Sequence, residues 1–386
     1  MVGKTVLILG GGFGGLATAN QLRRLLATEH RVVVVERQST FYMWPFNMRL
    51  MAGEAKDRRE GERALSGLAR KGIEWVQGEV QELDPKARRV RTSSGILEGD
   101  FVVIALGAEK DATAVPGFAE SAYNLYDPDG ALRIYNALQE FDSGRAVVLI
   151  SRTPFSCPAA PYEAAFLMDS AFRSKGNRNR VEIAIYTPEP RPMPAAGPQM
   201  GEAVIGMLKE RDISYYPQQK LQRIENTSHK IVFEGGQAPF DLLVGIPPHF
   251  APKVVREAGL TDETGWIPVD LQTMETRYPG VFALGDVTFI RQPNPTGLPL
   301  PKAWVIADEQ ARVVARNIAA QIRSEDQSNK YDGKGFCYIE VGGGQAAYGS
   351  GSFYEYPAAR VYLEPPSHHH HEERKKGEME QLETLV

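Results

Sequence analysis

The start of the chain places a strand, a glycine-rich turn, a helix and a second strand in immediate succession. Residues 5–9 form a short apolar run typical of a buried strand, and apolar side chains recur at helical spacing over residues 15–26. Between these segments Gly10, Gly12 and Gly15 form the pattern G-x-G-x-x-G. Such glycines allow a tight turn, let the backbone approach a pyrophosphate and let the helix pack on the strand. The sequence therefore predicts a Rossmann-like unit in which the helix N-terminus binds a dinucleotide phosphate.

An acidic residue follows the second predicted strand. The predicted strand covers residues 31–35 and is followed directly by Glu36, which lies 21 positions after Gly15. This spacing suits a carboxylate that accepts hydrogen bonds from the ribose hydroxyls of an adenosine. A third strand, within residues 100–107, closes the unit. The residues expected to line the dinucleotide site from this part of the chain are Gly10, Gly12, Phe13, Gly14, Gly15, Glu36, Arg37, Pro45, Val80, Ala105 and Gly107.

Length and composition exclude several classes of protein. A chain of 386 residues suits two or three domains. Its 44 basic and 48 acidic residues leave no basic surplus, so no nucleic-acid partner is predicted. No apolar run is long enough for a membrane-spanning helix, and the N-terminus lacks a signal-peptide core, which predicts a cytoplasmic location. The tetra-His run at residues 368–371 is interpreted as part of a solvated tail, and no metal site is predicted.

A second motif lies far downstream, where Thr276 is followed by an apolar strand that ends in Gly285 and Asp286. Together with the first motif it resembles the flavoproteins with two dinucleotide-binding domains. The resemblance implies FAD, with Asp286 bonded to the ribityl chain and Gly285 letting the backbone approach. A helix is expected over residues 300–322 with its N-terminus at the flavin pyrimidine edge, where Lys302 would add a full positive charge.

The glycine fingerprint that flavoproteins of this kind use for NAD(P)H is absent. After a predicted strand at residues 146–150 the chain reads SRTPFSCPAAPYE, and no glycine follows until Gly176. Prolines in this turn remove the N–H donors that a pyrophosphate needs. The sequence predicts a second Rossmann-like unit that has lost its nicotinamide site and carries Cys157 in its place.

Both cysteines of the chain lie in recognisable motifs. C-P-x-x-P-Y-E begins at Cys157, and G-x-C-Y-I-E-x-G surrounds Cys337. These stretches resemble the sulfide:quinone oxidoreductase and flavocytochrome c sulfide dehydrogenase flavoprotein family. The resemblance implies catalytic Cys157 and Cys337, which form a disulfide or a sulfur-bridged pair, oxidise sulfide to persulfide or polysulfide sulfur, and pass two electrons through FAD to a quinone or a cytochrome. A helix N-terminus after Cys157 favours its thiolate, and Glu163, one to two turns into that helix, could exchange a proton.

The chain also departs from that family. The stretch AYNLYDPDG lacks the third cysteine that quinone-reducing relatives often carry, which puts a three-thiol mechanism in doubt. Residues 41–48 lack the cysteine that attaches FAD in the flavocytochromes, so FAD is expected to bind non-covalently. The region after Leu363 is short and polar, so peripheral contact with the cytoplasmic membrane face remains an open alternative. Assembly into a homo-oligomer also remains open.

The expected fold class is α/β, with two Rossmann-like dinucleotide-binding domains and a small C-terminal region. Residues 1–110 and 241–325 are expected to form the FAD-binding domain, residues 111–240 the second Rossmann-like domain, and residues 326–386 the region that carries Cys337. Two alternatives remain: an enzyme like a type II NADH:quinone oxidoreductase, and a non-catalytic flavoprotein redox sensor.

Overall fold

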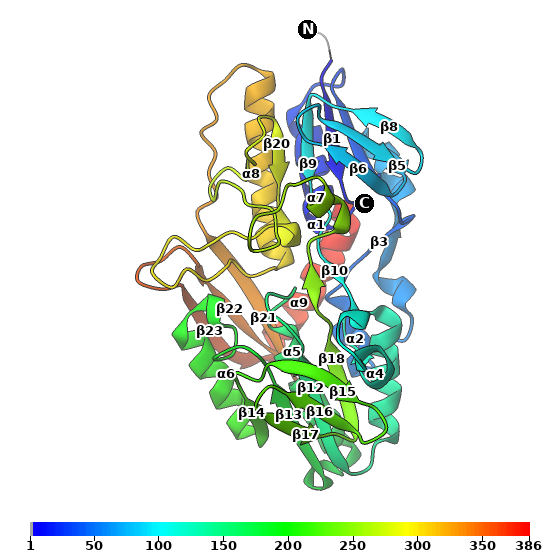
Figure 1. Cartoon of the computed structure of the whole chain (residues 1–386), viewed down its shortest axis with the longest axis vertical. Coiled ribbons are helices and arrows are strands. Elements are labelled where there is room, and N and C mark those ends of the chain that lie inside the picture. The colour runs from blue at the N-terminus through cyan, green and yellow to red at the C-terminus, as the bar shows by residue number, and fades with distance from the viewer. Residues whose placement is uncertain (1–2) are drawn as a thin grey trace.

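The computed structural model describes residues 3–386, and its first element is a five-stranded parallel sheet (Figure 1). Its strands, in spatial order, are β20 (Val281–Ala283), β9 (Phe101–Ile104), β1 (Thr5–Leu9), β2 (Arg31–Glu36) and β5 (Glu74–Gln77). The sheet thus combines the N-terminal part of the chain with a strand from far downstream, as the two motifs predict.

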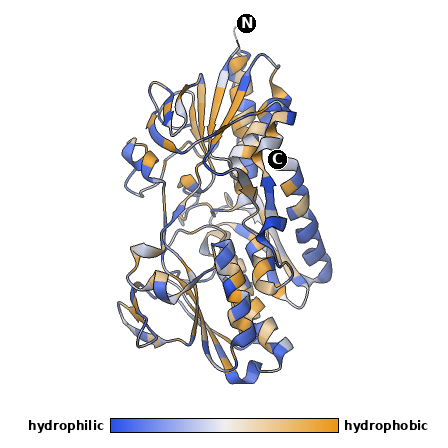
Figure 2. Ribbon diagram, turned by 90° about the vertical axis from the view of Figure 1, so that its right-hand side faces the viewer, coloured by the Kyte–Doolittle hydropathy of each residue, from blue (hydrophilic) through white to orange (hydrophobic). Residues whose placement is uncertain are grey.

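Both faces of this sheet are buried, which explains why β1 is apolar throughout rather than alternating. Val6 and Ile8 share one core with α1 (Phe13–Leu25) and α8 (Trp304–Ile322). Leu7 and Leu9 share another core with an antiparallel meander. The strands of the meander are β6 (Val80–Asp84), β7 (Arg89–Thr92) and β8 (Gly95–Glu98). The strands of the first sheet are mainly orange, and therefore apolar, in Figure 2.

A second five-stranded parallel sheet repeats this plan. Its strands, in spatial order, are β11 (Tyr123–Asn124), β18 (Leu242–Ile246), β12 (Gly144–Ile150), β13 (Val181–Tyr186) and β14 (Ile213–Tyr216). Its helices are α4 (Pro128–Glu140), α5 (Ala160–Lys175) and α6 (Pro198–Glu210), and its meander consists of β15 (Leu221–Glu225), β16 (Lys230–Phe233) and β17 (Gly236–Pro239). Two such units confirm the predicted fold class.

Two predicted boundaries need correction. The strand β18 was expected in the FAD-binding domain from residue 241 onward, but it pairs with β11 and β12 in the second sheet, where its five residues are all buried. The helix expected from residue 300 begins only at Trp304, because Lys302 lies in an extended segment that forms a parallel bridge with Ser156. We keep the remaining domain limits as a proposal.

The C-terminal region consists of an antiparallel sheet and a long helix. The strands are β21 (Lys334–Gly342), β22 (Gln345–Ser352) and β23 (Arg360–Ser367), and the helix is α9 (His368–Leu385). Strand β21 lies along α5, and α9 packs on β22 and reaches α1 (Figure 1). The expected solvated tail is therefore wrong. Leu382 and Leu385 are buried, and α9 is a docked element of the fold.

Short elements connect these parts. The strands are β3 (Thr40–Tyr42), β4 (Glu62–Ala64), β10 (Glu109–Lys110) and β19 (His249–Phe250), and the α-helices are α2 (Phe46–Ala52), α3 (Phe118–Ser121) and α7 (Lys253–Glu257). The 3-10 helices are η1 (Arg58–Gly61), η2 (Leu65–Lys71), η3 (Ala112–Ala114), η4 (Arg178–Arg180), η5 (Pro194–Ala196) and η6 (Gly285–Val287). Within residues 3–386, no helix has both the length and the apolar composition needed to cross a membrane.

Candidate active site

One cleft brings the predicted site residues together. Its volume is about 1040 Å³, at the upper end of the range for small-molecule sites and enough for a dinucleotide. Residues of both Rossmann-like units and of the C-terminal region line it. The predicted residues in its lining are Gly10, Gly12, Phe13, Gly14, Glu36, Arg37, Pro45, Val80, Ala105, Gly107, Cys157, Glu163, Gly285, Asp286, Lys302 and Cys337. Of the predicted set, Gly15 does not line this cleft.

The three fingerprint glycines are needed for different structural reasons. A Cβ atom on Gly10 would lie 2.4 Å from the carbonyl oxygen of Ala105, and Gly10 has a φ of +107°. A Cβ atom on Gly15 would lie 1.9 Å from the carbonyl oxygen of Gly10, so both glycines are required by the turn itself. At Gly12 a Cβ atom would meet nothing within 4 Å. The space at Gly12 opens into the cleft, as the close approach of a phosphate requires.

Glu36 closes the same turn from the end of β2. Its Oε2 accepts a hydrogen bond from the N–H of Gly11 at 2.8 Å, and its Oε1 accepts one from the N–H of Gln38 at 2.9 Å. These two backbone donors hold the carboxylate at the cleft wall. Each oxygen keeps a lone pair for a ribose hydroxyl, so the arrangement fits an adenosine.

At the other end of the cleft, Asp286 lies on η6, directly after the tight turn at Gly285, whose φ is +70°. The Oγ of Ser156 donates a hydrogen bond to Oδ2 of Asp286. Ser156 is a site residue that the sequence reasoning missed, although it stands directly before the cysteine motif. The bond ties the second Rossmann-like unit to the segment expected at the flavin.

Lys302 differs from the prediction. Its Nζ donates to the carbonyl oxygens of Asp286 at 2.6 Å and Thr288 at 2.8 Å, and lies 3.5 Å from the centre of the Trp266 ring. Burial lowers the pKa of Lys302 to about 7, against the opposing effect of the Asp286 carboxylate. Lys302 therefore anchors the loop before α8. Its amino group is bonded to two backbone carbonyl oxygens, so it does not stand free at the helix start as the sequence predicted.

A second lysine in the cleft, Lys110, was missed. Its Nζ lies 3.7 Å from the centre of the Trp44 ring and 5.4 Å from that of Tyr126. Burial lowers the pKa of Lys110 to about 8, while Asp286 and Cys157 act in the opposite direction. No motif surrounds Lys110, and only the position of β10 beside the predicted loop at Gly107 could have suggested it.

Cys157 lies in the loop that replaces the second glycine fingerprint. It has a φ of +48°, an unusual value for a residue other than glycine, and hydrogen bonds hold it there. Its N–H donates to the carbonyl oxygen of Lys302 at 2.6 Å, and its carbonyl oxygen accepts from the N–H of Ala160 at 3.0 Å and from the hydroxyl of Tyr126 at 3.3 Å. The backbone of Cys157 is thereby fixed to the opposite wall of the cleft.

Cys337 enters the same cleft from β21, and both cysteines are free thiols. Burial, followed by the Glu163 carboxylate, raises the pKa of each thiol to about 12. Burial therefore acts against the favoured thiolate predicted for Cys157, and the role of Cys157 stays a prediction. The loss of water and the nearby carboxylate of Glu163 both disfavour a thiolate at Cys157 and at Cys337.

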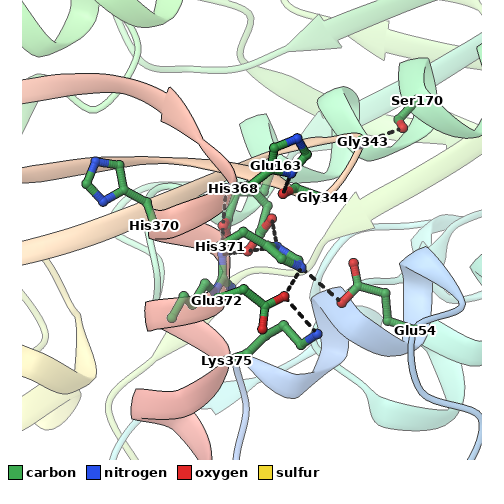
Figure 3. Close-up of polar contacts among 12 residues, drawn as sticks. Glu54, Glu163, Ser170, Gly343, Gly344, His368, His370, His371, Glu372 and Lys375 are labelled. Carbon is green, nitrogen blue, oxygen red and sulfur yellow. Dashed lines mark hydrogen bonds and ion pairs between the residues drawn. The ribbon is translucent and has the colours of Figure 1, made fainter.

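Glu163 is buried and does not stand free in the cleft. Its Oε1 accepts hydrogen bonds from the N–H of Glu340 at 2.9 Å and from Nη1 of Arg374. Arg374 comes from α9, and His371 from the tetra-His run lies in the same buried region (Figure 3). The helix that was interpreted as a tail thus contributes charged side chains to the lining of the cleft.

A buried hydrogen bond links the first turn of α5 with the segment after β13 in the second Rossmann-like unit. Tyr162 is fully buried at the start of α5, and its hydroxyl donates to Oε2 of Glu189 at 2.7 Å. Glu189 follows β13, at the strand end where a Rossmann unit usually binds a ribose. The carboxylate of Glu189 is thus bound to side chains of the protein, and the loss of the nicotinamide site stays a prediction.

The similarities to known proteins follow this geometry. A mitochondrial sulfide:quinone oxidoreductase of Mus musculus is 28% identical over 87% of this chain and 75% of its own length. A type II NADH:quinone oxidoreductase of Staphylococcus aureus is 22% identical over 88% of this chain and 86% of its own length. The crystal structure of the sulfide:quinone oxidoreductase from Aquifex aeolicus has 24% identity and a TM-score of 0.86, over 99% of this chain and 91% of that one.

Residues 4–311 match the model of a family described as pyridine nucleotide-disulphide oxidoreductases. The match spans both sheets, the fingerprint glycines, Cys157 and the first part of α8. On this ground the chain belongs to the pyridine nucleotide-disulphide oxidoreductase family.

Proposed function

We propose that this protein is a sulfide:quinone oxidoreductase that oxidises sulfide with Cys157 and Cys337 and passes two electrons through FAD to a quinone. The observation that carries the proposal is the placement of both cysteines, the only two in the chain, in the cleft that holds the dinucleotide turn. The names of the mouse and Aquifex relatives support the substrate and the acceptor.

FAD fits the residues of the cleft, and proteins of this family bind it. The open space at Gly12 and the carboxylate of Glu36 suit its phosphates and its adenosine, and Asp286 suits its ribityl chain. Bound FAD supplies a two-electron acceptor. Neither cysteine lies within residues 41–48, so we propose non-covalent binding.

The thiol chemistry follows from burial. Since both thiols have a raised pKa, a free thiol is a poor nucleophile here, and hydrosulfide is the better attacking group on a Cys157–Cys337 disulfide. That attack forms one S–S bond to a cysteine, breaks the disulfide and releases the other cysteine as a thiolate. A second hydrosulfide removes the outer sulfur as disulfane and leaves two thiolates. These two thiolates could close again to the disulfide, and FAD held by Glu36 and Asp286 would supply the acceptor for the two electrons that this oxidation releases.

We propose that Glu163 gives a proton to, or takes a proton from, the thiol of Cys157 or Cys337 when that thiol is released from the disulfide. Its carboxylate is buried in the cleft, and its negative charge contributes to the raised pKa of each thiol. Arg374 keeps it hydrogen-bonded and oriented.

The type II NADH:quinone oxidoreductase alternative is supported by relatives of that name from several strains of Staphylococcus aureus, at 22% identity. The lack of a glycine between residues 151 and 175, after β12, speaks against it, because a pyrophosphate needs the backbone donors of such a turn. A redox sensor built on the same cysteines would show one slow turnover with sulfide and none with a quinone.

A quinone acceptor resides in a membrane, so we propose a cytoplasmic protein with peripheral membrane contact. The aromatic side chains of Tyr356 and Tyr362 are 75% and 59% exposed and suit such contact. Vesicle flotation with the Tyr356→Ser variant as comparison tests this. Recovery of all wild-type protein in the soluble fraction would contradict it.

The central experiment replaces each cysteine by serine and measures anaerobic flavin bleaching by sulfide in stopped flow. Cys157→Ser and Cys337→Ser should each abolish bleaching while FAD stays bound, and the double variant should be little worse than either, because the pair acts as one unit. Wild-type bleaching in Cys157→Ser would refute the dithiol mechanism. Normal bleaching in Cys337→Ser alone would leave a monothiol scheme. Adding decylubiquinone or cytochrome c to the sulfide-reduced enzyme then identifies the acceptor.

A further inference from the structure

Arg374 of α9 lies at the centre of a buried cluster in which one guanidinium meets three carboxylates. Its Nη1 donates to Glu163 of α5, its Nε donates to Oε1 of Glu378 at 2.8 Å, and its Nη1 lies 3.7 Å from Oε1 of Glu340 on β21. The four side chains are each at most 9% exposed. Oε2 of Glu378 has no hydrogen-bond partner. Within the cluster, Arg374 is the only permanent positive charge for three carboxylates.

A histidine completes the outer side of this cluster and fixes α9 in place. Nδ1 of His371 bonds to Oε2 of Glu340 at 2.9 Å, and its Nε2 lies 3.9 Å from the carboxylates of Glu54 and Glu372 (Figure 3). Glu340 is therefore hydrogen-bonded by His371, and its interaction with Arg374 is weak because the two groups lie 3.7 Å apart. The strongest partners of Arg374 are Glu163 and Glu378.

The cluster adjoins both thiols. Arg374 and Glu378 line the same cleft as Cys157 and Cys337. The carboxylate of Glu163 raises the pKa of each thiol, and the guanidinium of Arg374 lowers it. Two further groups of the cleft act on Cys157: the charge of Lys110 on β10 interacts with the thiol, and the hydroxyl of Tyr126 donates to the Cys157 carbonyl oxygen at 3.3 Å.

We propose that α9 is a working part of the thiol site, in which Arg374 is a positioning residue that neutralises Glu163 and so makes the thiolates of Cys157 and Cys337 attainable. Glu378 sets how much of the Arg374 charge remains for the thiols. The inference rests on the proposed function only in treating these two cysteines as the reacting groups.

The physical reason is the low polarity of the site. A thiolate formed beside an uncompensated carboxylate repels it, and water that would screen the repulsion is excluded by burial. With Arg374 hydrogen-bonded to Glu163, the pair is close to neutral, so ionising the thiol costs less. Removing Arg374 and removing the Glu378 charge should therefore change thiol reactivity in opposite directions.

The test measures the alkylation rate of each thiol in the FAD-loaded, phosphine-reduced protein, with iodoacetamide and mass spectrometry of the two cysteine peptides between pH 7 and 10. Arg374→Gln should slow both cysteines at least tenfold, which corresponds to one unit of thiol pKa, since only the thiolate reacts. Glu378→Gln should speed them at least threefold. Arg374→Lys, which keeps the charge, should stay within threefold of wild type. His369→Gln on the exposed side of α9 is the matched control.

A helix that only packs over the thiols predicts another pattern. Loosening α9 would expose the sulfurs, so Arg374→Gln and Arg374→Lys would both react faster than wild type, and that result overturns the proposal. Circular dichroism and bound FAD check the fold. If Arg374→Gln does not fold, the alkylation rates of Arg374→Lys and Glu378→Gln test the proposal instead. Unchanged rates in Glu378→Gln overturn the proposal, and so does a large increase in the rates of Arg374→Lys. Alkylation needs no turnover, so inactivity toward sulfide with the predicted rates would remove the proposed function alone.

Discussion

The glycine at position 12 offers the sharpest test of the cofactor site, because the structure separates its role in the fold from its role toward a ligand. Gly12 has a φ of −85°, which alanine adopts freely, and an added Cβ atom meets nothing within 4 Å. Alanine is a slightly poorer N-cap than glycine but reduces the entropy of the unfolded chain. These effects oppose each other, so Gly12→Ala should change the free energy of unfolding of the apoprotein by less than about 1 kcal/mol.

FAD binding should respond very differently. The methyl group would occupy the space through which a phosphate reaches the backbone N–H groups at the start of α1. Loss of one charge-assisted hydrogen bond costs about 1.5–3 kcal/mol. At 1.4 kcal/mol per factor of ten, the dissociation constant for FAD should rise by roughly 10- to 100-fold.

The assay pairs FAD titration by flavin fluorescence with thermal unfolding of the apoprotein followed by circular dichroism. Gly10→Ala is the comparison, because its Cβ atom would lie 2.4 Å from the Ala105 oxygen at a φ of +107°, so this variant should lose stability without any ligand. Wild-type FAD affinity in Gly12→Ala would show that the phosphate does not lie at this turn, and the site built on it would fall.

Three further outcomes are expected. Glu36→Gln keeps the shape of the side chain but loses a charged acceptor, so FAD should bind about 10- to 100-fold more weakly; unchanged affinity would place the ribose contact elsewhere. Burial raises the pKa of Glu189 from 4.5 to about 7, although its hydrogen bonds with Tyr162 and Thr187 act in the opposite direction. Because the folded state holds this proton more tightly than the unfolded state, the stability of the fold falls as the pH rises from 4.5 to 7. Glu189→Gln should therefore melt at a higher temperature than wild type at pH 8, and the gap should vanish toward pH 4.5. NADH should not bleach the flavin, and rapid bleaching would revive the NADH-dependent reading.

The glycine turn, the acidic strand end and the Gly285–Asp286 turn could be predicted because each depends on neighbours within a few residues. A buried parallel strand must be apolar, and a tight turn at a phosphate must be glycine, so the local sequence carries the information. The cysteines could be located from their motifs, and the structure places both in one cleft. Their pKa could not be predicted, because it depends on burial by segments from three parts of the chain.

The docking of α9 could not be predicted, for a related reason. The helix is rich in charge, and a charged stretch near a chain end is usually solvated. Its anchors include Arg374, whose partner Glu163 lies 211 positions earlier. No periodicity within the helix reveals such a contact. Lys302 shows the same limit, since its place at a helix start suggested a free charge, whereas two backbone carbonyls fix it.

The loop that carries Cys157 is held in place by contacts that a glycine turn in the same position would not make. In place of a glycine turn, the loop after β12 extends across the cleft and pairs with the segment before α8 through Ser156 and Lys302. The Oγ of Ser156 reaches Asp286, and the N–H of Cys157 reaches the Lys302 carbonyl. A loop bound in this way no longer presents N–H groups to a pyrophosphate, yet it holds Cys157 beside the residues expected at the flavin. Glycines introduced into this loop would therefore not by themselves free its N–H groups, because Ser156 and Cys157 remain bound to the segment around Asp286 and Lys302.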